Sequence, residues 1–284
     1  DEQILFLAME YVSGGSLSQR LASTEEFEVA DRIRIVTEVA EGLAHVTLAL
    51  RLDAYDAEAN FIAGNLHRAL GRPADARDAF GWAARSMAYR SAANVQLAEL
   101  ALMRSDWPEA RRYADIALDY NRLNLTSWDI LATVGRKTGD RALVQSSSAR
   151  LLELDPLHHF VRAEAYLAAP GPNTLSAFMN GLRSEFPDQT VLELAIAYTN
   201  RGLFGDATAL LTGAGATLRN PILRAWLAYL KRDTGALAPP ADLKFVFPYR
   251  LESLPVLSWA AKQNSHWSWS YLLALNLWAF DRRD

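Results

Sequence analysis

The chain has 284 residues, of which 50% are hydrophobic and 22% are charged, and its formal net charge is -4. This composition is typical of a folded chain. The slight acidity gives no electrostatic reason to expect nucleic acid or an anionic membrane as a partner, and the absence of cysteine excludes disulfides and thiolate chemistry. The apolar stretch at residues 271–280 is about half as long as a membrane-spanning helix.

The first 45 residues differ in kind from the rest of the chain. Residues 4–9 read as a short apolar strand, the letters EYVSGGSL follow at residues 10–17, and a helix ending in EGLAH is predicted over residues 29–45. This segment resembles the hinge and the following helices of a bacterial Ser/Thr protein kinase. The resemblance implies that Met9 is the gatekeeper and that the backbone of residues 10–12 faces adenine.

The groups that phosphoryl transfer requires are nevertheless missing. A kinase needs a Gly-rich loop, a strand lysine with its glutamate, a catalytic aspartate and a metal-binding aspartate, and none is present here. The sequence then passes into repeat sequence near residues 43–47, within what we predict to be one continuous helix. We therefore expect residues 1–45 to be a kinase-hinge-like fragment, whose strand is poorly packed or lies against the first repeat. We do not expect the chain to be an enzyme.

A small residue recurs every 34 positions, at Gly64, Ala98 and Ala132, and its neighbours recur in the same register. A period of this length is typical of a helix-turn-helix unit that must stack on its neighbours to bury its apolar face. Gly64 is expected to lie where two helices cross closely, and Phe80 to fill the space between successive pairs. The sequence therefore predicts an all-α solenoid with repeats in strict register over residues 46–168.

The full pattern is a large residue, Leu-Gly, an aromatic, Ala, an aromatic, Ala and a closing Pro, and it resembles the tetratricopeptide family. Trp128 takes the large-residue position and Pro156 closes the third unit, whereas Val144 stands where the family has a small residue. The resemblance implies a tetratricopeptide-like helical-repeat solenoid, here with a short N-terminal strand-like segment. It also implies that the first helices of the repeats line a concave, protein-binding face.

The strict period breaks in the fourth unit. Pro170, Gly171 and Pro172 follow a helix predicted over residues 160–168, and these three residues predict a loop or kink. Residues 169–236 are therefore predicted to be degenerate helical repeats.

A linker is predicted at Pro239 and Pro240, and residues 237–284 are predicted to be a truncated C-terminal helical pair. The last helix, over residues 269–279, reads as the first helix of a repeat, and we expect it to lack its partner. Residues 46–284 also resemble the repeat part of large bacterial proteins that carry an N-terminal domain of unknown function. That resemblance implies a bacterial origin and an interaction module of a longer chain.

Candidate binding residues follow from the tetratricopeptide resemblance, in which the first helices line the concave groove. We expect a protein or peptide partner to contact Phe61, Asn65, Arg68, Val95, Glu99, Met103 and Asp129. A clamp of Lys, Asn and Arg for a terminal carboxylate is disfavoured, because only Asn65 matches it and because Glu99 and Asp129 carry the wrong sign.

Neither the histidines nor the C-terminal aromatic residues indicate catalysis. His158 and His159 are adjacent, so on a helix they point about 100° apart and cannot form the i, i+4 pair of a metal site. We expect no catalytic, cofactor-binding or metal-binding residue, and no cofactor. An aromatic cluster is expected to seal the end of the solenoid, or alternatively to line a peptide or carbohydrate pocket. It consists of Trp259, Trp267, Trp269, Tyr271 and Trp278.

The leading hypothesis is a non-catalytic scaffold that binds a protein or peptide in its concave face, with neither nucleic acid nor a membrane as partner. The alternative is a fragment of a bacterial Ser/Thr protein kinase with C-terminal tetratricopeptide repeats, whose catalytic residues are absent from this chain. Because the chain starts at Asp1 within a strand-like run, we expect any targeting segment to lie upstream, and the cytoplasm is only slightly favoured. The sequence determines neither the partner nor the oligomeric state.

Overall fold

The computed structural model describes residues 29–184, 186–215, 220–240, 242–244 and 246–279. The predicted N-terminal strand and hinge-like residues lie before this part, outside the described residues. The helices are α3 (Val29–Leu52), α4 (Ala57–Ala69), α5 (Pro73–Ala83), α6 (Arg90–Met103), α7 (Trp107–Tyr120), α8 (Leu125–Thr138), α9 (Arg141–Leu154), α10 (His159–Ala168), α11 (Pro172–Gly181), α12 (Pro187–Asn200), α13 (Phe204–Gly215), α14 (Pro221–Lys231), η1 (Thr234–Ala236), α15 (Ser253–Gln263) and α16 (Trp267–Ala279).

Several helices begin where the sequence supplies a capping side chain or a proline. Asp56, Asn124 and Asp140 are N-caps, whose side-chain oxygens accept hydrogen bonds from main-chain N–H groups in the first turns of α4, α8 and α9. Proline occupies the start of α5, α11, α12 and α14, where its missing N–H costs no helical hydrogen bond. Gly139 caps the end of α8 with a φ of 74°, which glycine adopts without strain.

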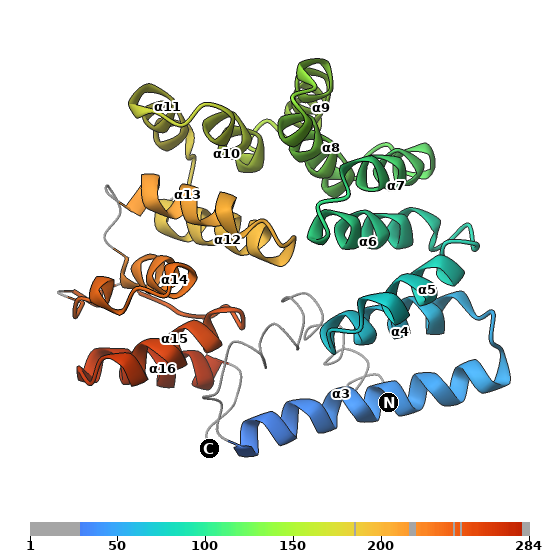
Figure 1. The fold of residues 1–284 in the computed structure, drawn as a ribbon, viewed down its shortest axis with the longest axis horizontal. Coiled ribbons are helices and arrows are strands. Elements are labelled where there is room, and N and C mark those ends of the chain that lie inside the picture. Colours follow the sequence, from blue (N-terminus) through green and yellow to red (C-terminus); the bar gives the residue numbers. More distant parts are fainter. Residues whose placement is uncertain (1–28, 185, 216–219, 241, 245, 280–284) are drawn as a thin grey trace.

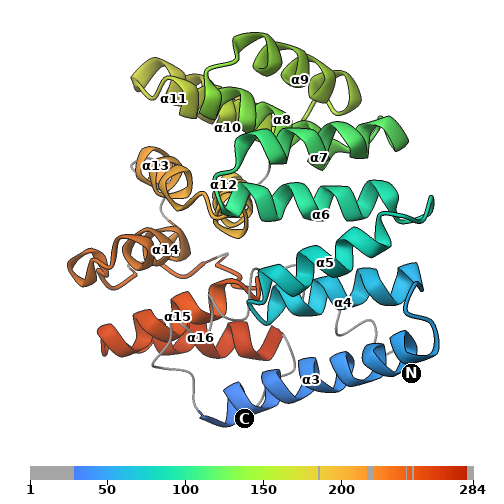
Figure 2. The same ribbon diagram turned by 45° about the vertical axis from the view of Figure 1, so that its right-hand side comes forward.

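Successive helices pack as pairs, namely α4 with α5, α6 with α7, α8 with α9, α10 with α11, α12 with α13 and α15 with α16. Figures 1 and 2 show these pairs stacked side by side in a curved superhelix. No strand occurs within the described ranges. The predicted all-α helical-repeat solenoid is therefore confirmed.

The small residues that define the 34-residue period are buried in the stack. A Cβ atom on Gly64 would lie 2.5 Å from Cε1 of Phe80, so α4 and α5 could not cross as closely with a larger residue there. Phe80 is fully buried in one cluster with Ala93 and Leu97 of the next pair. The prediction that Phe80 fills the space between successive pairs is confirmed.

The helix α3 continues without interruption through the point where the kinase-like sequence passes into repeat sequence. Val46, near that join, packs in one cluster with Ala59 and Ile62 of α4. The prediction of a single helix across residues 43–47 is confirmed, and α3 covers the first complete helix pair.

The break at Pro170 to Pro172 forms the turn between α10 and α11. A single apolar cluster then continues from Phe160 in α10 to Leu272 in α16, across the segment that contains Pro239. The helix α16 packs against the preceding helix α15. The expectation that the second helix of its repeat is missing remains a prediction. The apolar core runs past residues 168 and 236 without interruption. The domain boundaries proposed at these two residues remain predictions.

The end of the solenoid returns to its beginning. Leu254 of α15 is buried in a small cluster with Leu70, which follows α4, and with Leu273 and Leu277 of α16. Figure 1 accordingly shows the helix pairs arranged around a common centre, with α15 and α16 close to α3 and α4. The described chain therefore forms a nearly closed turn of superhelix.

Candidate functional site on the inner face

The helices α6, α8, α10 and α12 lie nearer the centre of the superhelix than their partners α7, α9, α11 and α13 (Figure 1). The inner face is the surface that these helices and α4 direct toward the centre. Of the seven predicted contact residues, Phe61, Asn65 and Arg68 lie on α4, Val95, Glu99 and Met103 on α6, and Asp129 on α8. Four are at most 9% exposed, namely Asn65, Arg68, Val95 and Asp129, and the other three are half-buried. Their contact with a partner remains a prediction.

The end of α12 covers part of this set. Arg201, the residue after α12, places Nε 3.6 Å from Oε1 of Glu99 and Nη2 3.5 Å from Oδ2 of Asp129. The main-chain oxygen of Asn200 accepts a hydrogen bond of 3.4 Å from Nη2 of Arg68. The turn between α12 and α13 thus rests on side chains from α4, α6 and α8, about a hundred residues earlier in the chain.

Glu99 lies between two guanidinium groups. Nη1 of Arg68 is 2.6 Å from Oε2 of Glu99, and Arg201 approaches the other oxygen. Burial raises the pKa of Glu99, but the charges and hydrogen bonds of Arg68 and Arg201 outweigh burial and lower the pKa below its usual value. Glu99 therefore remains ionised at neutral pH, which stabilises the contact with Arg201.

Arg201 is incompletely satisfied. Burial lowers the pKa of its guanidinium, but Asp129 and Glu99 outweigh burial and raise the pKa, so the group stays charged. Its Nη1 atom is nevertheless buried and donates no hydrogen bond to any described residue. A buried cationic donor without an acceptor costs free energy.

His158 joins the same set from the junction between α9 and α10. Its Nε2 lies 2.7 Å from Oδ1 of Asp129, and its Nδ1 lies 3.3 Å from Oδ2 of Asp155. The hydrogen bond with Asp129 raises the pKa of His158, burial opposes this effect, and the charges of Asp129 and Asp155 add to it. His158 therefore holds its proton to a higher pH than a free histidine does.

We expect the contribution of His158 to stability to fall as the pH rises. Its pKa in the folded state lies above the unfolded value of about 6.5, so the ion pairs contribute fully below that value and are lost as the pH rises through the folded pKa. The test compares the free energy of unfolding of the wild type and His158→Gln in urea across this range. The difference between the two proteins should shrink toward high pH, and a constant difference would contradict the assignment.

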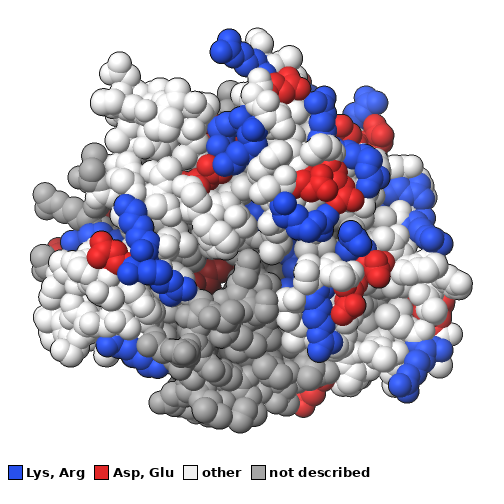
Figure 3. Space-filling view, in the orientation of Figure 1, with Lys and Arg blue, Asp and Glu red and all other residues white. Residues whose placement is uncertain are grey.

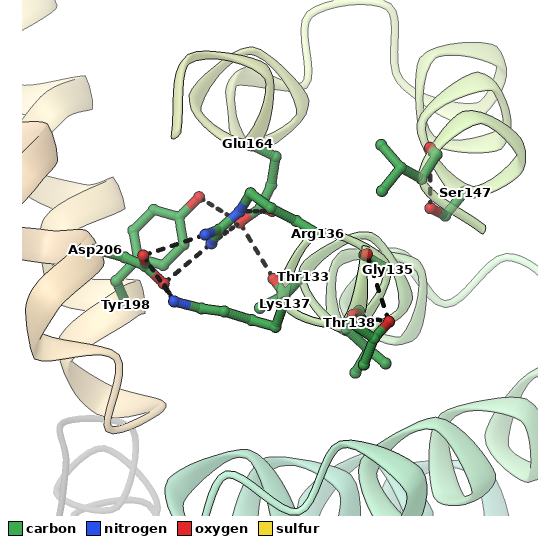
Figure 4. A network of polar contacts seen from close by, with 11 residues as sticks. Thr133, Gly135, Arg136, Lys137, Thr138, Ser147, Glu164, Tyr198 and Asp206 are labelled. Carbon is green, nitrogen blue, oxygen red and sulfur yellow. Dashed lines mark hydrogen bonds and ion pairs between the residues drawn. The ribbon is translucent and has the colours of Figure 1, made fainter. Parts of the chain in front are cut away.

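A second polar network joins α8 to α10, α12 and α13 (Figure 4). Arg136 donates to both carboxylate oxygens of Glu164, at 2.6 and 3.1 Å, and to those of Asp206, at 3.2 and 3.0 Å. Lys137 adds an ion pair of 2.7 Å to Asp206, and the hydroxyl of Tyr198 donates to Glu164 at 2.8 Å. A single guanidinium therefore connects two carboxylates from two later helix pairs.

Burial and charge act against each other in this second network. Burial alone lowers the pKa of Arg136 and raises that of Asp206. The hydrogen bonds and opposite charges outweigh burial in both cases, so both groups stay ionised. Burial and the negative charge of Glu164 raise the pKa of Tyr198 well above its usual value, so its phenol remains a hydrogen-bond donor.

The charges of the inner face nearly balance, so this face supports recognition by hydrogen bonds more than attraction of a strongly charged ligand.

In the part of the chain that the structure describes, no group of three or more His, Asp and Glu side chains could hold a metal ion. No described helix is long and apolar enough to cross a membrane. On the surface seen in Figure 3, positive and negative side chains also alternate, mainly over α4 to α9.

Sequence reasoning missed Arg136, Glu164 and Arg201. A signal for the first was available, because Arg136 follows Arg68 by two periods of 34 residues and both arginines pair with a carboxylate of a following first helix. No such signal exists for Arg201. Its partners depend on how far the superhelix curves, which the period does not specify.

No protein-family model matches this chain, and no curated protein matches it either. The helical-repeat fold therefore rests on the sequence period and on the structure. The kinase-hinge resemblance falls mainly on residues before 29, outside the described residues.

Proposed function

We propose that this chain is a tetratricopeptide-like scaffold without catalytic activity, which binds a protein or peptide segment on its inner face. The close crossing of Gly64 and Phe80 supports the family assignment, because it pairs a small and an aromatic residue at the positions where the tetratricopeptide pattern has them. Phe61, Glu99 and Met103 keep part of their surface accessible to a partner.

The observation that carries the proposal is the partly accessible surface of Phe61, Glu99 and Met103 on the first helices α4 and α6. The side chains of Phe61 and Met103 offer apolar contacts to a partner. The carboxylate of Glu99 can accept a further hydrogen bond from an N–H group of an extended peptide. The proposed partner is therefore a peptide segment that lies along α4 and α6.

A selection of displayed random peptides on the immobilised full chain tests this proposal. We expect enriched peptides whose dissociation constants, measured by fluorescence anisotropy, rise about tenfold or more in Met103→Ala and Glu99→Gln. Leu152→Ala is the matched control, because Leu152 is exposed and lies on α9, one of the outer helices. Peptides that bind all three variants equally, or a selection without enrichment, would contradict an inner-face site. Transfer of phosphate from ATP to a generic protein substrate would contradict the absence of catalysis.

A further inference from the structure

The helix α16 carries an exposed apolar stripe. Trp267, Tyr271 and Trp278 are 63%, 45% and 66% exposed, and Ala274 between them is exposed as well. At 100° per residue these four positions fall within a sector of about 60°, so they form one line along about three turns. None of the 13 residues of α16 is charged.

The opposite side of α16 is already used within the chain. Trp269 and Leu272 are fully buried in the large core, and Leu273 and Leu277 pack in the cluster of Leu254. Asn276 donates a hydrogen bond of 2.9 Å to the main-chain oxygen of Arg250. These contacts hold the helix in place, so the stripe is presented on a fixed support.

The spacing of the stripe is that of a coiled-coil seam. The intervals 267 to 271, 271 to 274 and 274 to 278 are four, three and four residues, which are the alternating steps between d and a positions of a heptad. A seam of two tryptophans and a tyrosine on an exposed helix face indicates an interaction surface.

We propose that this stripe pairs with the same stripe of a second copy of the chain, antiparallel and about a two-fold axis. The four positions are symmetric about the point between Leu272 and Leu273. An antiparallel pair therefore places Tyr271 opposite Ala274 of the partner subunit, and Trp267 opposite Trp278 of the partner subunit. Each large tyrosine meets a small alanine, and each tryptophan meets a tryptophan, as an isologous interface requires.

Parallel pairing does not give this fit. It would set Tyr271 against Tyr271 of the partner subunit, and Ala274 against Ala274 of the partner subunit, so one layer would be overfilled and the next left empty. Without charges on α16, no ion pairs select another orientation. The match of sizes thus selects the antiparallel dimer. A contact of three turns is smaller than a standard interface, so we expect a dissociation constant on the order of 10–100 µM.

Sedimentation equilibrium of the full chain, from about fivefold below to about fivefold above that range, tests the proposal. The wild type should show a monomer-dimer equilibrium. Tyr271→Ala and Ala274→Tyr should each weaken homodimerisation about tenfold or more, the first by leaving two small residues in contact and the second by overfilling both layers. Both positions are exposed, so circular dichroism and the thermal midpoint should stay unchanged.

The decisive measurement is an equimolar mixture of the two variants. In a heterodimer each tyrosine again faces an alanine at both contacts, so association should return to within about threefold of the wild-type value. Trp82→Ala, which alters an exposed aromatic residue of α5, should leave the equilibrium unchanged. A wild type that stays monomeric, a dimer that both single variants leave intact, or a mixture that does not associate would each overturn the proposal. None of these outcomes depends on the inner-face function.

Discussion

Replacing Arg136 by methionine should lower the free energy of unfolding by about 3–5 kcal/mol. The substitution keeps most of the side-chain volume but removes the guanidinium that pairs with Glu164 and Asp206. Glu164 is only 2% exposed, so its carboxylate would be left buried without a cation. Asp206 would suffer less, because Lys137 remains at 2.7 Å. Urea denaturation followed by tryptophan fluorescence measures the loss.

Two further variants separate the charge from other effects at this position. Arg136→Met/Glu164→Gln should recover much of the lost stability, because glutamine is neutral and its oxygen can still accept the hydroxyl of Tyr198. The matched surface control is Arg111→Met, which removes a half-exposed arginine 3.2 Å from Asp140 and should cost less than about 1 kcal/mol. Equal losses for Arg136→Met and Arg111→Met would show that the buried network does not stabilise the fold.

Replacing Gly202 by alanine should destabilise the protein by about 2–4 kcal/mol, through two additive causes. The φ of Gly202 is 74°, in the left-handed region that alanine adopts only with strain. A Cβ atom there would also lie 3.0 Å from Cα of Met103, so the turn after α12 would be pushed away from α6. The loss should appear in the urea midpoint of the full chain.

Gly139 provides a control with the same backbone conformation. Its φ is also 74°, but a Cβ atom there would meet nothing within 4 Å, so Gly139→Ala should cost only the conformational strain of about 1–2 kcal/mol. The difference between the two variants measures the contact of the α12–α13 turn with α6. If the two variants were equally stable, that contact would contribute nothing to closure of the superhelix.

Much of the local structure could be predicted from individual residues. The turn at Pro170 to Pro172 follows from proline chemistry, and the close helix crossing at Gly64 follows from the absence of a side chain. The C-terminal aromatic cluster was predicted only as a group, and the structure divides it. Trp259 and Trp269 are buried, whereas Trp267, Tyr271 and Trp278 are exposed. Composition cannot make that division, because it depends on which side of α16 meets α15.

The inner face was predicted at the level of the helices that form it but not at the level of its contacts. The repeat register correctly places Arg68, Glu99 and Asp129 on successive first helices. It does not indicate that Arg201 would lie between the two carboxylates, or that His158 would bridge Asp129 and Asp155. Arg201 and its two partners come from separate helix pairs, as do His158 and Asp129, and the distance between such pairs depends on the angle at every intervening interface. Asp155, by contrast, lies in the same turn as His158.

By itself, the sequence determined the all-α repeat, the starts of several helices and the close crossing at Gly64, because these depend on backbone preferences and on contacts between neighbouring units. Only the tertiary structure decided that the superhelix closes, that Arg201 occupies its inner face and that the stripe of α16 stays uncovered. The physical reason is that closure adds up small rotations at successive interfaces, and no single segment of sequence specifies their sum.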